Sequence, residues 1–429
     1  MNSLFRSKYS IASVLLLYYS YLNPLRKLVI PLSEIVIPLM LSISLFCIAY
    51  SGHFKISYRS KCQFLLFASW ISILVLILFH NVSLKDTLIT GGYIQLFVMV
   101  FFLIFSNYNT LWLKTFFKWG VFAALLYALT TIVFYYNPSL YLKFLFILYE
   151  PEKVASIMRF FDLGWISGIC DHFSTNGMVL SMGCIFIYEY IRHLQFSNSV
   201  KIKKYWYVFL LVVFYALILS SKRGPLIAAL VSIFIVYCIC SSGNTLRKIL
   251  KAGVVLAVVF FLVQFFSDYI PGLSTIADKF QFTEKEGDVL QGRDILWDLA
   301  YKMFDSSPFL GEGYGSYAIY AEKSSLFTST AHNLYLEILS QLGLLGLFLY
   351  MLAFTSCLII SINMLKLLCF SNHNSFDICI LKISTEIQIF VLVYGMTGST
   401  LSYYTILIPF FMACSCAVVI QNKYKYFNK

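Results

Sequence analysis

Residues 205–241 read YWYVFLLVVFYALILSSKRGPLIAALVSIFIVYCICS, and this stretch shows how the chain is built. Two apolar runs, at 205–220 and 224–241, flank a short turn that contains Lys222 and Arg223. An α-helix needs about 20 mostly apolar residues to cross the hydrocarbon core of a bilayer. Both runs are close to this length, so the stretch predicts a pair of antiparallel membrane-spanning helices.

The same pattern recurs along the 429 residues, of which 60% are hydrophobic and only 12% charged. Soluble proteins carry about 25% charged residues. The much lower charged fraction of this chain therefore excludes a soluble fold. Further apolar runs fall near 10–23, 31–50, 63–80, 88–107, 119–136, 173–191, 252–267, 333–363, 383–398 and 400–420. We therefore predict an all-α polytopic integral membrane protein of about twelve transmembrane helices, in which residues 1–429 form a single transmembrane domain. The run 10–23 is interpreted as a retained first helix, and the run 333–363 as either one long tilted helix or a broken one.

The distribution of charge predicts the orientation. Nineteen of the 32 Lys and Arg residues fall on one set of faces, and most of the others lie in two long loops at 136–171 and 268–331. Cytoplasmic loops carry the excess of Lys and Arg, and long loops have less influence on topology. We therefore expect both termini in the cytoplasm and both long loops outside. Orientation then explains the net charge of +12, and no nucleic-acid partner is expected.

Neither a cofactor nor a metal site is expected. The eleven cysteines form no C-x-x-C motif and no Cys/His ligand spacing, so they predict neither a structural disulfide nor a zinc site. The predicted cytoplasmic loops are too short for a nucleotide-binding domain. Any chemistry is therefore expected on the external side.

The large external loop at 268–331 holds ten of the chain's 20 acidic residues and is predicted to be partly helical. Residues 291–304 have helical spacing, and Pro308 and three glycines then indicate turns. The residues expected to share the apolar face of this helix are Ile295, Leu296, Leu299 and Met303.

Two arginines at the external side could bind phosphate. Arg223, beside Lys222, opposes the charge trend at that membrane face, and Arg293 begins the helix of an otherwise acidic loop. Arg presents a planar fork that suits a phosphate group. Alternatively, Lys222 and Arg223 reach to lipid phosphates at the interface, and Arg293 is a solvated residue paired with a carboxylate.

His332 is a candidate general base. Hydroxyls at 328–330 could cap the helix that follows, which would put His332 in its first turn. The positive end of the helix dipole would keep its imidazole neutral and able to accept a proton. A structural histidine at a helix start is the alternative. Glu337, further along, is expected to face the protein interior.

His172 lies in the segment DHFSTNG at 171–177, where the first external loop re-enters the membrane. This segment suits a capped helix start and a binding site equally well. The other histidines are weaker candidates, and His80 is expected to be isolated at the end of a span.

These segments together resemble the O-antigen polymerase (Wzy-type)/O-antigen ligase superfamily of bacterial surface-polysaccharide assembly. The matching pieces, in order, are SSKRGP at 220–225, GRDILW at 292–297, PFLGEGYGSY at 308–317 and AHNLYLEILSQLGLLG at 331–346. The resemblance covers residues 170–365 directly, and the outer spans match in pattern alone.

The resemblance implies a GT-C-like fold in the bacterial cytoplasmic membrane, with a site that faces the periplasm. It implies a glycan on undecaprenyl diphosphate as substrate, without metal or nucleotide. Arg223 and Arg293 resemble the diphosphate-binding arginines, and His332 resembles the proposed base. The second-tier candidates are Lys222, Glu337, Tyr314 and His172. Membrane lipids, a chain-length regulator and a flippase are the partners it suggests.

Three functions stay open. We favour a polymerase that joins lipid-linked repeat units, because the external loops are rich in aromatic residues and poor in Lys. A ligase would instead move the glycan to lipid A-core. A flippase would place charges near the midplane on interrupted helices, whereas the candidates here lie at external helix ends and Glu386 alone is expected deep within a span.

Overall fold

A computed structural model describes residues 60–82, 110, 112–170, 172–196, 204–241, 250, 293–324, 330–369, 375–399 and 404–425. Within these ranges every regular element is a helix, apart from one isolated bridge between Asn81 and Tyr314. The predicted all-α class is therefore confirmed for the described part of the chain.

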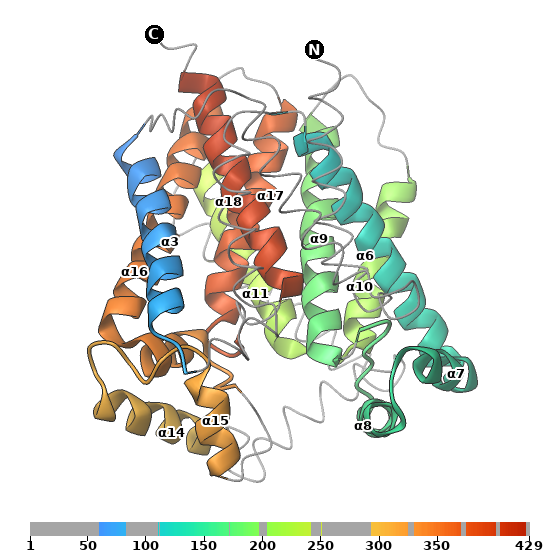
Figure 1. Cartoon of the computed structure of the whole chain (residues 1–429). Helices are drawn as coiled ribbons and strands as arrows, with labels where there is room; N and C mark the ends of the chain where they lie inside the picture. The colour runs from blue at the N-terminus through green and yellow to red at the C-terminus, as the bar shows by residue number, and fades with distance from the viewer. Residues whose placement is uncertain are drawn as a thin grey trace, which may run out of the picture.

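The long helices lie side by side in one bundle (Figure 1). They are α3 (Lys61–Phe79), α6 (Trp112–Tyr136), α9 (Phe173–Phe196), α10 (Tyr205–Leu219), α11 (Arg223–Cys240), α16 (Leu334–Cys369), α17 (Ser375–Tyr394) and α18 (Tyr404–Lys425). Eight of the predicted apolar runs fall on these helices. The runs 10–23, 31–50, 88–107 and 252–267 lie outside the described residues.

Five of the described helices are long and apolar enough to cross a membrane. They are α3, α6, α11, α16 and the part of α18 from Ile406 to Tyr424. In α18, 94% of the apolar stretch is buried, against 28% in α11, so α18 lies inside the bundle and α11 at its surface. The total of twelve spans stays a prediction.

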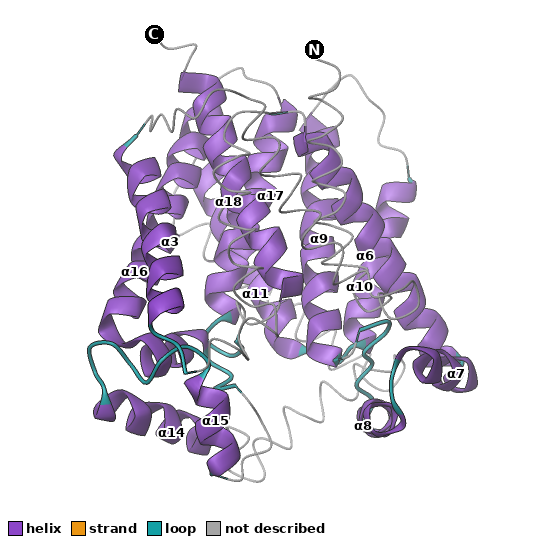
Figure 2. Cartoon of the chain, in the orientation of Figure 1, coloured by secondary structure: helices purple, strands orange, loops and turns teal. Residues whose placement is uncertain are grey.

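Short helices gather at one end of the bundle (Figure 1). They are α7 (Pro138–Leu148) and α8 (Pro151–Asp162), from the first predicted external loop, and α14 (Arg293–Ser306) and α15 (Ser316–Lys323), from the second. Figure 2 shows irregular segments at the same end. The described parts of both predicted external loops therefore meet the bundle at one face.

The predicted helix in the large loop is confirmed as α14, with one error in its apolar face. Leu296, Ala300 and Met303 are buried, and Leu299 packs against them. Ile295, by contrast, is 57% exposed, so its assignment to the buried face was wrong. Buried residues at 296, 300 and 303 follow the spacing of a helical face, and residue 295 lies beside that stripe.

Helix α16 is broken within the run 333–363, which decides between the two alternatives. Gly343 has φ 62° and ψ −163°, so the helical hydrogen bonds stop there. A break inside a membrane requires other partners for the freed backbone groups. Here the segment 308–313 supplies them: Glu312 N donates to Ser340 O (3.0 Å), Gly313 N to Gln341 O (2.9 Å) and Leu344 N to Pro308 O (2.9 Å).

The close contact between residues 308–313 and α16 explains one glycine on each side, Gly311 in the segment 308–317 and Gly343 in α16. A Cβ on Gly343 would lie 2.3 Å from Phe309 O, and one on Gly311 would lie 2.4 Å from the Gln341 carbonyl carbon. Both residues also have left-handed φ angles, of 62° and 76°. Glycine is therefore required at both positions by conformation and by space.

The interior of the bundle contains more charge than the sequence indicated. Glu386, expected to be alone deep within a span, is fully buried in α17. Glu189 of α9 is also buried, and its carboxylate lies 3.6 Å from the Lys382 ammonium. Glu386 is therefore buried as expected, and Glu189 and Lys382 meet nearer the end of the bundle, where α9 and α17 pack together.

Candidate functional site

The candidate residues collect at the end of the bundle where α14 and α15 lie. Arg223 begins α11, Arg293 begins α14, His332 precedes α16 and His172 precedes α9. These residues are up to 160 positions apart in sequence, between 172 and 332. The direction in which each helix crosses the bundle brings them to one face (Figure 1).

The turn between α10 and α11 is fixed by its serines. Ser220 Oγ donates to Leu217 O (2.7 Å) and Ser221 Oγ to Gly164 O (2.9 Å), and both residues are buried. Ser221 has a left-handed φ of 52°. This anchored turn presents half-buried Lys222 and Arg223 as a defined pair instead of as two solvated side chains.

Lys222 contacts the start of α9. Its Nζ lies 4.1 Å from the centre of the Phe173 ring, a cation–π distance. Gly177 of α9 also lies against the Lys222 side chain, where an added Cβ would come within 2.9 Å. Lys222 is therefore positioned by protein contacts, which disfavours the alternative that it reaches only to lipid.

His332 does not lie in the first turn of a helix, as the sequence suggested. It lies two residues before α16 and has a left-handed φ of 50°. Asn333 caps the helix instead: its Oδ1 accepts hydrogen bonds from Tyr335 N (3.0 Å) and Leu336 N (3.2 Å). The hydroxyls at 328 and 329 lie outside the described residues. The helix therefore begins later than expected, because an Asn side chain accepts hydrogen bonds from backbone N–H groups two and three residues further along and caps a helix as effectively as Ser or Thr.

The residues on both sides of His332 are held in place. Ala331 is buried in a small apolar cluster with Ala300 and Met303 of α14 and Tyr317 of α15. On the other side, Leu334 N donates to Gly395 O (2.8 Å), beyond the end of α17. The imidazole is thus placed between the loop helices and the bundle.

The electrostatic interactions show which candidates lie close together. Burial, together with the positive charges of Arg293 and Lys222, lowers the pKa of His332 to about 4. The charge of Arg293 also acts on Arg223. His332 is therefore neutral at pH 7 as expected, but because of burial and neighbouring cations instead of a helix dipole.

Residues 208–351 match the family described as O-Antigen ligase. This match supports the predicted O-antigen polymerase/ligase superfamily. The matching segment runs from α10 into α16 and contains Arg223, Arg293 and His332. No curated protein matches the chain significantly.

The family and the five apolar helices together indicate an integral protein of the inner membrane. Members of the family are glycosyltransferase-like enzymes of polysaccharide biosynthesis. The predictions of the superfamily and of a membrane protein are therefore confirmed.

His172 caps a helix and also lies near the charged cluster. Its Nδ1 accepts a hydrogen bond from Ser174 N (3.2 Å) at the start of α9. Burial, together with the charges of Lys222, Lys153 and His332, lowers its pKa to about 3. The capped helix start is therefore confirmed, and a binding site at His172 stays a prediction.

Two second-tier candidates belong to a different group. The charges of Glu337 and the Tyr314 hydroxyl act on Tyr350 of α16, and Glu337 acts on Tyr317 as well. Tyr314 is held at the end of α3, where its backbone N–H donates to His80 O (3.0 Å). These contacts associate both residues with the join between the large loop and the bundle.

Sequence reasoning missed His80 and Glu312. The His80 Nε2 lies 3.0 Å from Gly311 O, so this histidine contacts the glycine-rich segment and is not isolated. Glu312 accepts hydrogen bonds from Ser306 (2.6 Å) and Tyr320 (2.8 Å), which join the ends of α14 and α15. The signal for Glu312 was its place between two glycines in a matching motif, whereas nothing near His80 in sequence indicated its partner.

Proposed function

We propose that this protein is a repeat-unit polymerase. It transfers a glycan from an undecaprenyl diphosphate carrier to a second lipid-linked repeat unit at the outer face of the cytoplasmic membrane. The observation that carries the proposal is that Arg223, Arg293 and His332 lie at the same end of the bundle, where the charge of Arg293 acts on the other two. These three residues come from separate elements within the segment that matches the family.

The proposed orientation puts this cluster outside and both termini in the cytoplasm. Lys114, Lys204 and Lys366 lie toward the ends of α6, α10 and α16 that face away from the cluster, as the positive-inside rule requires for a cytoplasmic face. The proposal includes about twelve spans in one GT-C-like transmembrane domain over residues 1–429, with external loops at 136–171 and 268–331.

Arg223 and Arg293 hold the diphosphate. Two cations that act on each other are costly to keep close unless an anion lies between them. A diphosphate is such an anion, and each guanidinium can bind it through a bidentate fork. As the glycosyl bond breaks, negative charge grows on the departing diphosphate oxygen, and arginines already in place stabilise it.

His332 accepts the proton of the attacking sugar hydroxyl. In the empty site its pKa is about 4, so it is neutral but weakly basic. Two of the three causes are the charges of Arg293 and Lys222. A bound diphosphate neutralises those charges and therefore raises the pKa of His332 toward neutrality, where general base catalysis is most effective. The base thus becomes effective when the donor is bound.

Lys222 and His172 support this site. Lys222 acts on both histidines and would add a third positive charge beside the diphosphate. His172, neutral and tied to the start of α9, can present its other ring nitrogen, Nε2, to a sugar hydroxyl. We assign both residues to donor binding and positioning.

A ligase is the second candidate, because the matched family is described as O-Antigen ligase. The two functions differ in the acceptor, so purified protein in liposomes distinguishes them. With the lipid-linked repeat unit as sole substrate, a polymerase produces a ladder of longer lipid-linked chains. A requirement for added lipid A-core, with no lengthening in its absence, would replace the polymerase by the ligase.

In the cell, a chain-length regulator and a flippase would act with the polymerase. Deletion of the gene should then leave single repeat units on the final acceptor. An acceptor that is bare, with polymer retained on the lipid carrier, would indicate the ligase.

A further inference from the structure

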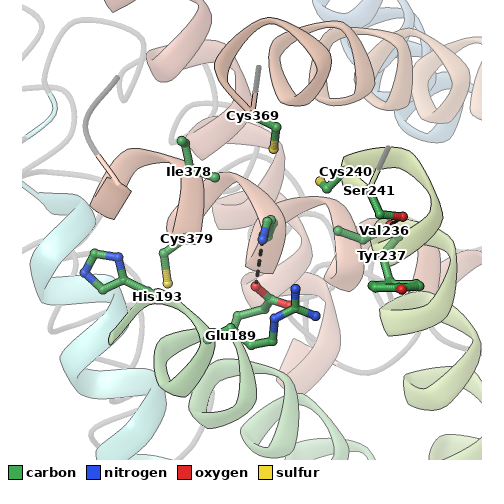
Figure 3. Close-up of a pocket in the computed structure, with 11 residues that line it drawn as sticks. Glu189, His193, Val236, Tyr237, Cys240, Ser241, Cys369, Ile378 and Cys379 are labelled. Atoms are coloured by element: carbon green, nitrogen blue, oxygen red, sulfur yellow. Dashed lines mark hydrogen bonds and ion pairs between the residues drawn. The ribbon is translucent and has the colours of Figure 1, made fainter. Parts of the chain in front are cut away.

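A second site lies at the opposite end of the bundle from the charged cluster. A cavity of about 480 Å³ is bounded by the end of α9, the end of α11, the last residue of α16 and the first turns of α17 (Figure 3). Its lining includes Glu189, Arg192 and Lys382 together with the thiols of Cys240 and Cys369. None of these residues takes part in the proposed glycosyl transfer.

Cys240 and Cys369 form a pair. They end α11 and α16, and the side chains of both line the same cavity. Figure 3 shows both side chains on the same side of the cavity. Both are partly exposed, whereas six of the other described cysteines are buried (Cys170, Cys184, Cys357, Cys379, Cys414 and Cys416). A reagent that enters the cavity can therefore reach this pair.

A cation lies in the cavity with these thiols. The Lys382 ammonium lines it together with both cysteines and is held there by its ion pair with the Glu189 carboxylate (3.6 Å). The thiolate is the nucleophilic form of cysteine, and a neighbouring cation stabilises it. The pair therefore combines access, a nearby cation and a second thiol within reach.

We propose that Cys240 and Cys369 are an oxidation site that a hydroperoxide converts to an intramolecular disulfide. One thiolate attacks the peroxide, an S–O bond forms as the O–O bond breaks, and the leaving alkoxide takes a proton. The second thiolate then attacks the sulfenic sulfur, the S–S bond forms and hydroxide leaves as water. Two thiols are oxidised, and one hydroperoxide is reduced to an alcohol, or to water in the case of hydrogen peroxide.

The proposal is independent of the glycosyl transfer and concerns only the state of the two thiols. On the proposed orientation this end faces the cytoplasm, where thiols are kept reduced, so the disulfide forms under oxidative conditions. It joins the end of α11 to the end of α16, two helices whose opposite ends carry Arg223 and follow His332.

The experiment uses the purified full chain in lipid nanodiscs treated with hydrogen peroxide. Free thiols are then alkylated, and the protein is digested and analysed by mass spectrometry without reduction. We expect a peptide pair linked through Cys240 and Cys369, loss of both thiols from alkylation, and recovery of both with dithiothreitol. In Cys240→Ser, the remaining Cys369 should be trapped by dimedone as a sulfenic acid.

Cys238→Ser is the matched control. Cys238 lies on the same helix with the same partial exposure but outside the residues that line the cavity. This variant should form the Cys240–Cys369 link as fast as the original chain. The proposal is overturned if Cys238 or Cys62 is oxidised as fast as the pair, or if Cys369 links instead to Cys379 or to no other cysteine.

Discussion

At the scale of single residues, the proposed mechanism depends on the ability of two arginines in the charged cluster to bind phosphate. Arg223 and Arg293 are proposed to bind a diphosphate through bidentate forks, which a lysine cannot reproduce. Arg223→Lys and Arg293→Lys should therefore each lower the rate of glycan transfer by about 10²–10³-fold, the cost of losing one well-placed donor. Lipid-linked product analysed on a gel over time measures this loss.

Arg159→Lys provides the control for these variants. Arg159 is exposed on α8, at the same end of the bundle, and its replacement keeps a charge of the same sign. Its rate should stay unchanged. Normal rates in both cluster variants would show that Arg223 and Arg293 act only as interfacial cations.

The pH dependence of the reaction tests the coupling between His332 and the donor. The neutral imidazole is the active form, so the rate falls as pH drops below the pKa. In the free protein this pKa is about 4. The acid limb of kcat/KM should therefore lie near pH 4, and that of kcat should lie at a higher pH, because the bound diphosphate offsets the charges of Arg293 and Lys222. If the acid limbs of kcat/KM and kcat fell at the same pH, binding of the donor would not raise the pKa of His332 as proposed.

At the scale of elements, the join between the large loop and α16 depends on glycines. Gly343→Ala should destabilise the fold by about 1–3 kcal/mol through its left-handed φ alone, and further because its Cβ would lie 2.3 Å from Phe309 O. Thermal unfolding of the detergent-solubilised protein should show a clear drop in Tm.

Gly315→Ala separates these two causes. Gly315 also has a left-handed φ, of 86°, but nothing lies within 4 Å of its Cβ position. Its Tm should therefore fall less than that of Gly343→Ala. Equal losses would mean that the close approach of the segment 308–313 to α16 does not contribute to stability.

The elements also show what the sequence could predict. Apolar periodicity predicted α14, and the length of the apolar runs predicted the long helices. Both were possible because a helix that packs against lipid or a core shows its buried face as a local pattern of apolar residues. The break at Gly343 depends on hydrogen bonds to residues 308–313, which are distant in sequence, and no local pattern reveals them. His332 was placed in a helix because several hydroxyls preceded it, whereas Asn333 takes the cap.

The motifs named Arg223, Arg293 and His332 as candidates, and the structure places all three at one end of the bundle. Their role in the site stays a prediction. The sequence could not show that Lys222 contacts Phe173 or that His172 joins the cluster, because both contacts cross between elements.

At the scale of the whole molecule, the proposed orientation is a claim about which end faces outward. Glu322 is exposed on α15 at the end of the cluster, and Lys114 is exposed on α6 at the other end. In intact spheroplasts, a membrane-impermeant maleimide should label Glu322→Cys and leave Lys114→Cys unlabelled until the cells are opened. The reverse pattern would invert the orientation and the proposed mechanism with it.

The central claim is that His332 acts as the base of a glycosyl transfer, and His332→Asn tests it most directly. Asn tolerates the left-handed backbone that residue 332 adopts, so the fold should be kept while the basic imidazole is removed. Asn333→Ala is the control, since loss of the α16 cap should cost about 0.5–2 kcal/mol of stability with little effect on the chemical step. The measurement is the single-turnover rate in liposomes with saturating undecaprenyl-diphosphate-linked repeat unit. We predict a rate about 10²–10⁴-fold below normal in His332→Asn, with donor binding retained. A normal rate and a full ladder of products in this variant would contradict the account.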